Sequence, residues 1–390
     1  MSKKLRVLYL QYTNPAAYPP LQHSSRILAN EGWEILFLGS GSHGADELEL
    51  PPHPNICVKR VGFCLAGWRQ KLHYVWFGLW VFLWTLRWRP RWIYASDLLS
   101  SPVAVLLSFV PGLFILYHEH DSPITFESSD SRFQKFLLKM RRTLALRAYL
   151  CVLPNERRAE RFTRETGTKR PVLCVWNCPS LREAAKNKRA GTRDRLVVFF
   201  HGSIVPARLP LTIMDALTRL PNRVMLRVAG YETIGHAGYL EALQNHAIEL
   251  GLSDRFEFLG CLSRQSLLEH CRDADVGLAF VPLRPEDFNQ QAMTGASNKP
   301  FDYLACGLAL LVSDLPDWRR TFVESGYGLA CNPGDAGSIA SALDWFLRHP
   351  AETRAMRVRG RQQILSEWNY ERQFVKVLAH MSDLGQLREA

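Results

Sequence analysis

Patterns typical of metal-binding, repeat and secreted proteins are missing from this sequence. Its nine cysteines include no CxxC pair, which argues against zinc-ribbon and thioredoxin-like motifs. It has no internal repeat and no low-complexity tract, which excludes a solenoid. No signal-peptide pattern precedes the strand-like run at residues 5–10, so we expect a cytoplasmic protein with reduced thiols.

Acidic residues are absent from two long stretches in the first half of the chain. None lies between Glu49 and Asp97, and none lies within residues 131–150. Both stretches are rich in basic residues, namely Lys59, Arg60, Arg69, Lys71, Arg87, Arg89 and Arg91 in the first and Arg132, Lys135, Lys139, Arg141, Arg142 and Arg147 in the second. Within a net charge of +11, this asymmetry predicts a basic first half that attracts nucleic acid or an anionic membrane surface.

Short apolar runs alternate with helical patterns along the whole chain of 390 residues. Largely apolar runs such as LRVLYL and VGLAFV are typical of parallel strands that are buried on both faces. The predicted strands are 5–12, 33–40, 55–62, 92–97, 113–120, 148–153 and 172–177 in the first half, and 196–202, 223–230, 255–260, 276–282, 308–313 and 327–331 in the second. The fold class is therefore α/β with parallel sheets.

The length of the chain predicts two domains of roughly 150–200 residues each. A polar segment at 180–194 is interpreted as the linker between them. We expect Rossmann-like domains at residues 1–180 and 195–367, each binding ligand at the carboxyl ends of its strands, with one cleft between them. Residues 368–390 contain an amphipathic helical pattern that would pack back on either domain, the first being the one we favour.

The segment ASNKPFDYLACG, residues 296–307, predicts a helix start directly in front of a buried strand. Ser297 or Asn298 suits the N-cap and Pro300 the first turn. One interpretation is a capped structural helix with a favourable acid near its N-terminus. The other is an anion site, in which free backbone N–H groups and Lys299 face a phosphate.

The predicted strand at 113–120 leads into four titratable residues, His118, Glu119, His120 and Asp121. Alternation along a strand puts the two histidines on one face and the two acids on the other. A metal site is one interpretation, although the sequence offers no spaced partner set elsewhere. The other interpretation is that both histidines only make structural hydrogen bonds at the end of the strand. The pattern D-A-D at 273–275 resembles a metal-binding D-x-D, but its helix-to-strand position is typical of capping acids.

Tryptophans recur every four residues at Trp76, Trp80, Trp84 and Trp88, within a helical pattern at 68–92. The uncharged core of this pattern, residues 74–86, is shorter than the ~20 residues that span a bilayer. The ridge is either a buried packing face or an interfacial membrane helix, and an apolar stripe beside basic residues at 131–150 favours the second. Aromatic and basic residues together also suit single-stranded nucleic acid, but no nucleic-acid motif accompanies them.

An ordered series of segments in the second half resembles the family-4 glycosyltransferases of the GT-B fold. The series consists of FHGSIVPARLPLTIMDAL, RVAGYET, RFEFLGCLSRQSLLEHCRDADVGLAFVPL, ASNKPFDYLACGLALLVSDLPD and GYGLACNPGDAGSIASAL. The first half resembles the family only loosely. The resemblance implies two Rossmann-like domains with parallel sheets facing a central cleft.

The resemblance also implies roles for particular residues of the second half. Asp302 matches the second glutamate of the family's E-x7-E motif, which binds the nucleotide ribose, while Thr294 replaces the first glutamate. Arg208 and Lys299 would hold the diphosphate, and Gly202 would let the ligand approach the backbone. Ser203 stands where the family has an arginine. The donor-binding set is thus Gly202, Arg208, Asn298, Lys299 and Asp302.

In the first half, His120 and Asp121 match the family's H-D pair near the reacting sugar, and they are the candidate catalytic residues. The implied reaction is transfer of a sugar from a nucleotide-sugar to a glycan or lipid-linked acceptor, with retention of configuration and without metal or cofactor. We expect a peripheral protein on the inner face of the membrane, with nucleic acid an unlikely partner. A nucleotide-sugar epimerase of the same fold and a non-enzymatic polyanion-binding protein are the alternatives.

Overall fold

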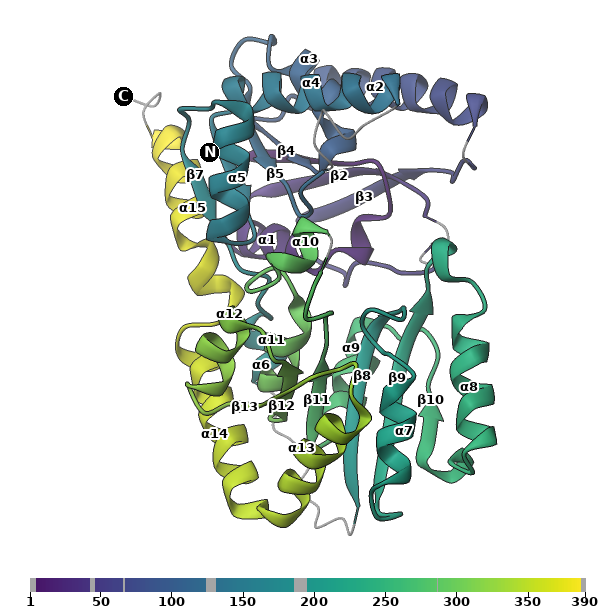
Figure 1. Cartoon of the computed structure of the whole chain (residues 1–390). Helices are drawn as coiled ribbons and strands as arrows, with labels where there is room; N and C mark the ends of the chain where they lie inside the picture. The colour runs from purple at the N-terminus through teal and green to yellow at the C-terminus, as the bar shows by residue number, and fades with distance from the viewer. Residues whose placement is uncertain are drawn as a thin grey trace. The chain divides into compact units, whose positions relative to one another are not determined.

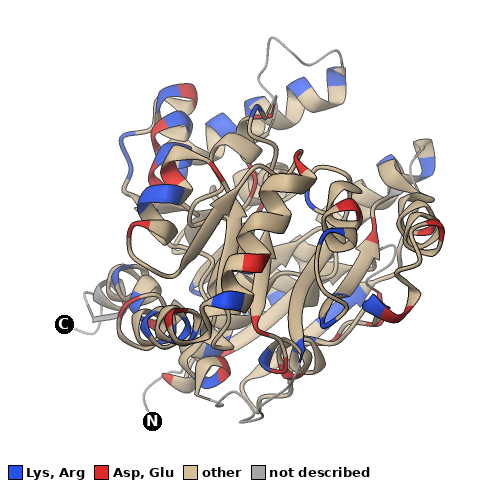
Figure 2. Ribbon diagram, turned by 60° about the horizontal axis from the view of Figure 1, so that its bottom comes forward, with Lys and Arg blue, Asp and Glu red and all other residues tan. Residues whose placement is uncertain are grey.

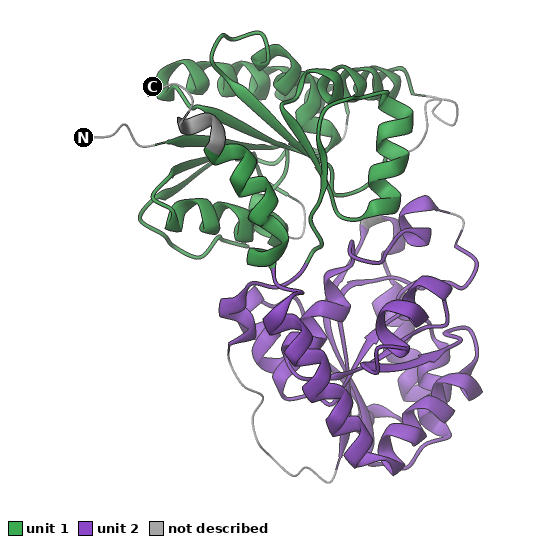
Figure 3. Cartoon of the chain, turned by 90° about the vertical axis from the view of Figure 1, so that its left-hand side faces the viewer, with its two compact units in different colours: residues 1–177, 370–390 green, residues 178–369 purple. Residues whose placement is uncertain are grey.

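A computed structural model describes residues 5–42, 46–65, 67–123, 131–185, 195–285 and 287–386. The chain forms two compact units (Figure 3). Unit 1 comprises residues 1–177 and 370–390, and unit 2 comprises residues 178–369. Each unit is an α/β domain with its own parallel sheet (Figure 1).

The sheet of unit 1 has seven parallel strands in the order β3-β2-β1-β4-β5-β6-β7. In chain order these are β1 (Arg6–Gln11), β2 (Glu34–Ser40), β3 (Ile56–Val61), β4 (Trp92–Ser96), β5 (Phe114–His118), β6 (Leu150–Leu153) and β7 (Val172–Cys174). The order reverses between β1 and β4, which is where open α/β sheets bind ligands.

Helices cover both faces of this sheet, as the apolar strands require. The helices of unit 1 are α1 (Pro19–Asn30), α2 (Trp68–Trp88), α3 (Ser101–Leu107), α4 (Arg132–Arg147), α5 (Glu156–Thr166) and α15 (Tyr370–Gln386). Residues of α2 to α5 pack with Leu8 and Leu10 on one face, whereas α1 and α15 pack with Val7 and Tyr9 on the other. Strand alternation therefore produces a three-layer sandwich.

The sheet of unit 2 has six parallel strands in the order β10-β9-β8-β11-β12-β13. They are β8 (Leu196–Ile204), β9 (Val224–Glu232), β10 (Phe256–Phe258), β11 (Val276–Ala279), β12 (Ala309–Ser313) and β13 (Gly328–Cys331). Residues of α7 (Thr212–Thr218), α8 (Tyr239–Glu249) and α13 (Ala336–Arg348) pack on one face of this sheet.

The remaining helices of unit 2 are α6 (Leu181–Ala184), α9 (Arg264–Arg272), α10 (Phe288–Gln291), α11 (Asn298–Ala305), α12 (Pro316–Trp318) and α14 (Pro350–Ser366). A π-helical turn follows α12 at Arg319–Val323. Short 3₁₀ turns occur at Pro15–Ala17, Leu98–Ser100, Ile234–His236 and Ser253–Arg255.

The predicted α/β class with two Rossmann-like domains is confirmed, and every predicted strand run contains a strand. Strand β5 ends at His118, two residues earlier than predicted, because the chain turns there into the titratable segment. The linker prediction is wrong at its start, since Ser180 caps α6 with a full capping box. Residues 186–194 of the predicted linker lie outside the described residues.

Within the described ranges, no helix is both long and apolar enough to cross a membrane.

Candidate functional site

Two glycines bring the ends of β8 and β9 close together in unit 2. Gly202 of β8 pairs with Gly230 of β9, and both adopt positive φ angles, +107° and +155°. A Cβ atom on Gly230 would lie 1.9 Å from the Gly202 carbonyl oxygen, so no other residue fits there. A Cβ atom on Gly202 would lie 3.0 Å from Lys299 Nζ, which places the lysine amine directly over this strand end.

Helix α11, which carries Lys299, begins at Asn298. Ser297 is its N-cap residue, in an extended conformation, but its side chain makes no capping hydrogen bond. The interpretation of this segment as a side-chain-capped structural helix is therefore not supported. The first N–H groups of a helix carry partial positive charge and bind anions where no side chain caps them. Asn298 and Lys299 are the first two residues of α11, and both are half-buried.

Lys299 and Arg208 form a cluster of positive charge with no paired acid. The pKa of Lys299 is lowered from 10.5 to about 7, mainly by burial and secondarily by the nearby Arg208, while Asp302 opposes the shift. The Lys299 amine also lies 5.7 Å from the centre of the Phe200 ring. Among the residues that the structure describes, neither cation forms an ion pair. Two cations so placed favour a bound anion.

Asp302 is buried and its charge is already compensated inside unit 2. Arg264 donates to both carboxylate oxygens, with Nη1 2.6 Å from Oδ2 and Nη2 2.7 Å from Oδ1. The same guanidinium reaches Glu183 of α6, with Nε 2.8 Å from Oε1. Arg264 thus bridges two acids from different helices. The ribose-binding role of Asp302 stays a prediction, and a carboxylate with two bound donors still has acceptor capacity left.

His201 is a residue of this site that the sequence did not single out. It lies directly before Gly202, is buried, and has Nε2 3.5 Å from Asp302 Oδ2. Burial, Lys299 and Arg264 lower the pKa of His201 well below 6.5, so the imidazole is neutral at physiological pH. The only available signal was its position at the end of β8, where Rossmann-like domains bind ligands.

The D-x-D pattern has structural partners. Asp275 accepts a hydrogen bond from the Val197 amide at 3.1 Å, and Arg357 lies 3.4 Å from its other oxygen. Asp273 is the C-cap residue of α9. These positions match the capping and solvating acids that the sequence indicated.

The histidines at the end of β5 lie on one side, as alternation predicted. The rings of His118 and His120 are 4.0 Å apart between centroids. His118 shares a 2.6 Å hydrogen bond between Nδ1 and the Tyr94 hydroxyl, and His120 one of 3.0 Å between Nε2 and the Ser96 hydroxyl. Burial, and secondarily His120, lowers the pKa of His118 well below 6.5. The His118 imidazole is therefore neutral at physiological pH.

The two acids point elsewhere and each has an arginine partner. Glu119 is fully buried and accepts hydrogen bonds from Arg141 Nη2 at 2.8 Å and from the Tyr117 hydroxyl at 2.9 Å. Asp121 is exposed and lies 3.0 Å from Nη1 of the buried Arg158, which also donates to the His120 carbonyl. The four titratable residues are thus divided between two environments. No group of three or more potential metal ligands occurs in the described part of the chain.

Asp97 is a second residue that the sequence did not single out. It directly follows β4 and has a φ of +63° with ψ of 173°, a conformation that is normally restricted to glycine. Its carboxylate accepts a hydrogen bond from the His120 amide at 2.9 Å. Burial raises the pKa of Asp97, and the interaction with His120 opposes this. Strained backbone beside the histidine pair marks this strand end as the candidate functional edge of unit 1.

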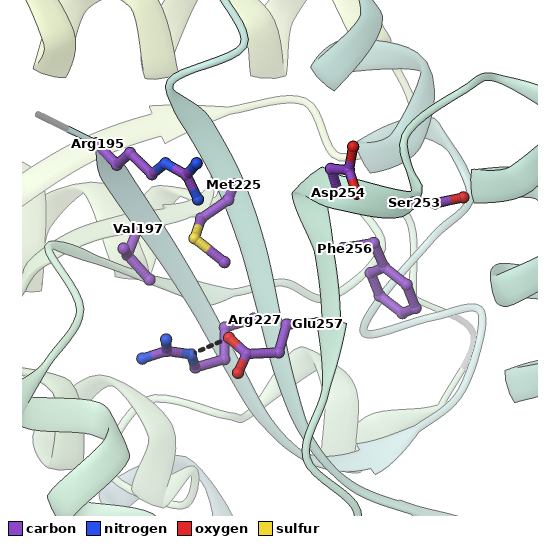
Figure 4. Close-up of a pocket in the computed structure, with 8 residues that line it drawn as sticks. All are labelled: Arg195, Val197, Met225, Arg227, Ser253, Asp254, Phe256 and Glu257. Atoms are coloured by element: carbon purple, nitrogen blue, oxygen red, sulfur yellow. Dashed lines mark hydrogen bonds and ion pairs between the residues drawn. The ribbon is translucent and has the colours of Figure 1, made fainter.

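A pocket in unit 2 lies at the opposite edge of the sheet. A pocket of about 710 Å³ is lined by the starts of β8, β9 and β10, with Arg195, Val197, Met225, Arg227, Ser253, Asp254, Phe256 and Glu257 (Figure 4). Arg227 and Glu257 within it form an ion pair of 2.6 Å. Parallel sheets bind ligands at the carboxyl ends of their strands, so this opposite edge is not the candidate site.

Residues 211–379 match a protein-family model described as glycosyl transferase-like. The chain is 25% identical over 207 residues to the GDP-mannose-dependent alpha-(1-6)-phosphatidylinositol monomannoside mannosyltransferase of Mycolicibacterium smegmatis, covering 53% of each chain. It is 29% identical over 174 residues to the D-inositol 3-phosphate glycosyltransferase of the same organism, covering 44% of this chain and 38% of that one. The chain thus spans about half or less of the length of these relatives.

The solved structure of Anabaena HepE in complex with UDP-glucose matches 97% of this chain and 100% of that one. The TM-score is 0.72 and the sequence identity 14%, so this likeness concerns the fold. Solved glycosyltransferases share the same arrangement of two parallel sheets with interleaved helices, which is the GT-B fold.

Proposed function

We propose that this chain transfers a sugar from a nucleotide-sugar donor to an acceptor hydroxyl, because it belongs with the group 1 glycosyltransferases of the GT-B fold. The observation that carries this proposal is the unpaired positive charge at the end of β8. Lys299, Arg208 and the uncapped start of α11 meet there beside a glycine backbone, in unit 2. A diphosphate is the anion that this combination suits.

In the proposed reaction, Lys299 and Arg208 neutralise the diphosphate as the bond between sugar and phosphate breaks. Fixed cations at a leaving group stabilise the charge that develops in the transition state. This supports a reaction that needs no metal ion. Gly202 keeps the strand end free of a side chain, so that the phosphate approaches the backbone N–H groups.

The nucleoside end of the donor would meet Asp302 and His201. Arg264 fixes the Asp302 carboxylate in place, and the neutral His201 ring stands beside it. We assign the ribose hydroxyls to these two residues, with Asn298 at the adjacent helix start. A carboxylate held by a bidentate arginine is a preorganised acceptor for hydroxyl groups.

His120 and Asp121 would act at the reacting end of the donor. An imidazole suits hydrogen bonding to sugar hydroxyls, and the Asp97 hydrogen bond positions the His120 backbone. We propose transfer with retention of configuration, in which the acceptor hydroxyl attacks from the face that the leaving group departs. The family likeness supports this stereochemistry.

The two relatives are named for a phosphatidylinositol mannoside and for D-inositol 3-phosphate. These names support a glycan or lipid-linked acceptor, presented to a peripheral protein on the cytoplasmic face of a membrane. The basic stretches of unit 1 also favour an anionic acceptor surface.

A panel of UDP-, GDP- and dTDP-sugars tests the proposal by thermal shift, followed by transfer assays with the donor that binds. A ligand at a hundredfold excess over its Kd stabilises the folded state by about 2.7 kcal/mol. We expect one nucleotide class to raise the Tm and to support transfer to an inositol-containing acceptor. Formation of an epimer without acceptor would identify an epimerase instead. Failure of every nucleotide to bind would contradict the enzyme proposal.

A further inference from the structure

The outward face of α2 carries an unusually long stripe of exposed apolar side chains. Eight residues between 38% and 69% exposed form it, namely Trp68, Leu72, Val75, Trp76, Leu79, Phe82, Leu83 and Leu86. At about 100° per residue these side chains fall within an arc of roughly 120° along the whole helix. Single exposed apolar residues are ordinary, but a continuous stripe marks an interaction surface.

The tryptophan ridge of the sequence is only partly this surface. Trp80, Trp84 and Trp88 are half-buried and pack against the core of unit 1, with Lys59 over the Trp84 ring at 5.0 Å. A spacing of four residues drifts by about 40° per step around a helix, so the ridge winds from the exposed Trp76 toward the sheet. The residues of the exposed stripe follow one another at alternating spacings of three and four, which keeps them on the outer face.

Neighbouring helices extend the apolar surface. Helices α2, α3 and α4 lie on the same face of the sheet and contact one another in sequence (Figure 1). Leu106 and Phe109, at the end of α3, are 67% and 63% exposed. Phe133 and Phe136 of α4 are also exposed, and Phe133 stacks edge-on with Tyr74 of α2 at 6.2 Å.

Basic side chains border the α2 stripe on both sides. On the helix, Arg69 and Arg87 lie within about 20° of one edge of the arc and Lys71 within about 20° of the other. All three are exposed, as are Arg132, Lys139 and Arg142 of α4. Arg141 is an exception, because it is buried against Glu119. No acid lies in either helix. Figure 2 shows how the basic and acidic residues are distributed along the ribbon. Long basic side chains beside an apolar stripe reach upward to the headgroups of anionic lipids.

We propose that this face of α2, with the adjoining ends of α3 and α4, inserts into the interfacial region of an anionic lipid bilayer. The proposal rests on the proposed function only in that the membrane would present a lipid-linked acceptor. A second copy of the chain is a poorer occupant, since a two-fold contact would place the basic borders of the stripe against each other. An anionic bilayer satisfies both the apolar stripe and its charged borders.

Flotation with vesicles of phosphatidylcholine, alone or in equimolar mixture with phosphatidylglycerol, tests the proposal at low and high salt. We expect the full chain to float only with the anionic vesicles, and less at high salt. Leu79→Glu with Leu83→Glu should abolish flotation. Replacing Arg69, Lys71 and Arg87 by Gln should weaken partitioning about 100-fold.

The matched control is Ile248→Glu with Val358→Glu, which places two acids at exposed apolar positions of unit 2. This control should float like the parent chain. Equal flotation of the α2 variants and the parent would overturn the proposal, as would a lipid-free dimer that the α2 variants dissociate. Calorimetry with the donor nucleotide on the same samples separates the two proposals. If the parent chain floats with the anionic vesicles but does not bind the donor nucleotide, only the proposed donor site is contradicted.

Discussion

Strand β8 of unit 2 and strand β5 of unit 1 both end among titratable side chains, but the charges are arranged in opposite ways. In unit 2 the acid Asp302 has an arginine partner and the cations Lys299 and Arg208 are left unpaired. In unit 1 the acids Glu119 and Asp121 have arginine partners, and the neutral His118 lies beside His120 at the strand end.

The same backbone architecture thus supports two different surfaces at equivalent edges. Excess cation suits a diphosphate, whereas neutral hydrogen-bonding groups suit a sugar. In both units, arginine side chains pair with the acids that lie near the strand ends. Under the proposed function, unit 2 would recognise the charged diphosphate and unit 1 would contact the sugar.

Arg264→Ala tests whether the ion pair between Arg264 and Asp302 stabilises unit 2, and it has the largest expected effect. The substitution leaves Asp302 and Glu183 without their shared cation inside unit 2. Removing one partner of a buried ion pair costs about 3–5 kcal/mol, which urea unfolding would measure. Arg320→Ala, at an arginine 75% exposed, is the control and should stay within about 0.5 kcal/mol of the parent. A similar stability for both variants would show that Asp302 does not depend on Arg264.

His120→Ala tests the histidine pair of unit 1. Donor binding should persist and turnover should fall by about 10²–10³, the usual loss when a preorganised hydrogen-bonding group is removed at a reacting centre. Calorimetry with donor and steady-state kinetics measure the two quantities separately. His236→Ala, at an exposed histidine of unit 2, is the control. A parallel loss of nucleotide affinity would indicate a folding defect rather than a role in the reaction.

Lys299→Ala and Arg208→Ala test the unpaired charge of unit 2. Each removes a charge-assisted contact of about 1.5–3 kcal/mol, so the Kd for the donor should rise about 10- to 150-fold. Isothermal calorimetry is the measurement. Arg348→Ala, on the exposed surface of α13, should bind like the parent. Parental affinity in both site variants would show that the diphosphate binds elsewhere.

The strand positions and the helix start at Asn298 were predictable because they depend on short-range pattern. Apolar runs of LVVFF type dictate buried parallel strands, and SNKP dictates a helix start. The partners of the acids were not predictable. Arg264 reaches Asp302 and Glu183 from another helix, and only the packing of α6, α9 and α11 brings these three together.

The strained Asp97 and the particular residues on the exposed face of α2 could not be predicted, for a related reason. Backbone strain at Asp97 depends on how β4 turns beside His120, which no local pattern encodes. The four-residue spacing of the tryptophans indicated a single face, but helical drift turns three of them toward the core. Which face of a helix meets the sheet is a property of the packed unit.

The pH dependence of donor binding has a smaller expected effect. The pKa of Lys299, about 7, lies far below its ordinary value of 10.5, so the free protein loses this charge as the pH rises through 7. Binding of UDP-glucose or a similar diphosphate diester should be constant below pH 7 and weaken by up to tenfold per pH unit above it. The free energy of unfolding without donor should instead rise with pH above 7, because Lys299 then binds its proton in the unfolded chain but not in the folded one. Calorimetry in buffers of different ionisation enthalpy measures the proton uptake, which Lys299→Ala should remove.

Removal of divalent metal ions should leave the rate of sugar transfer unchanged, which is the smallest expected effect. If Lys299, Arg208 and the start of α11 neutralise the leaving diphosphate, transfer in EDTA should proceed at the parental rate. The Asp275 carboxylate, engaged by Val197 and Arg357, is not arranged to recruit a metal for that purpose. The informative comparison is the double variant Lys299→Ala with Arg208→Ala, in which Mg²⁺ or Mn²⁺ should partly restore transfer by replacing the missing charge. Loss of parental activity in EDTA, with rescue by either metal, would instead show that the two cations are insufficient and that the charge of unit 2 is completed by a bound ion.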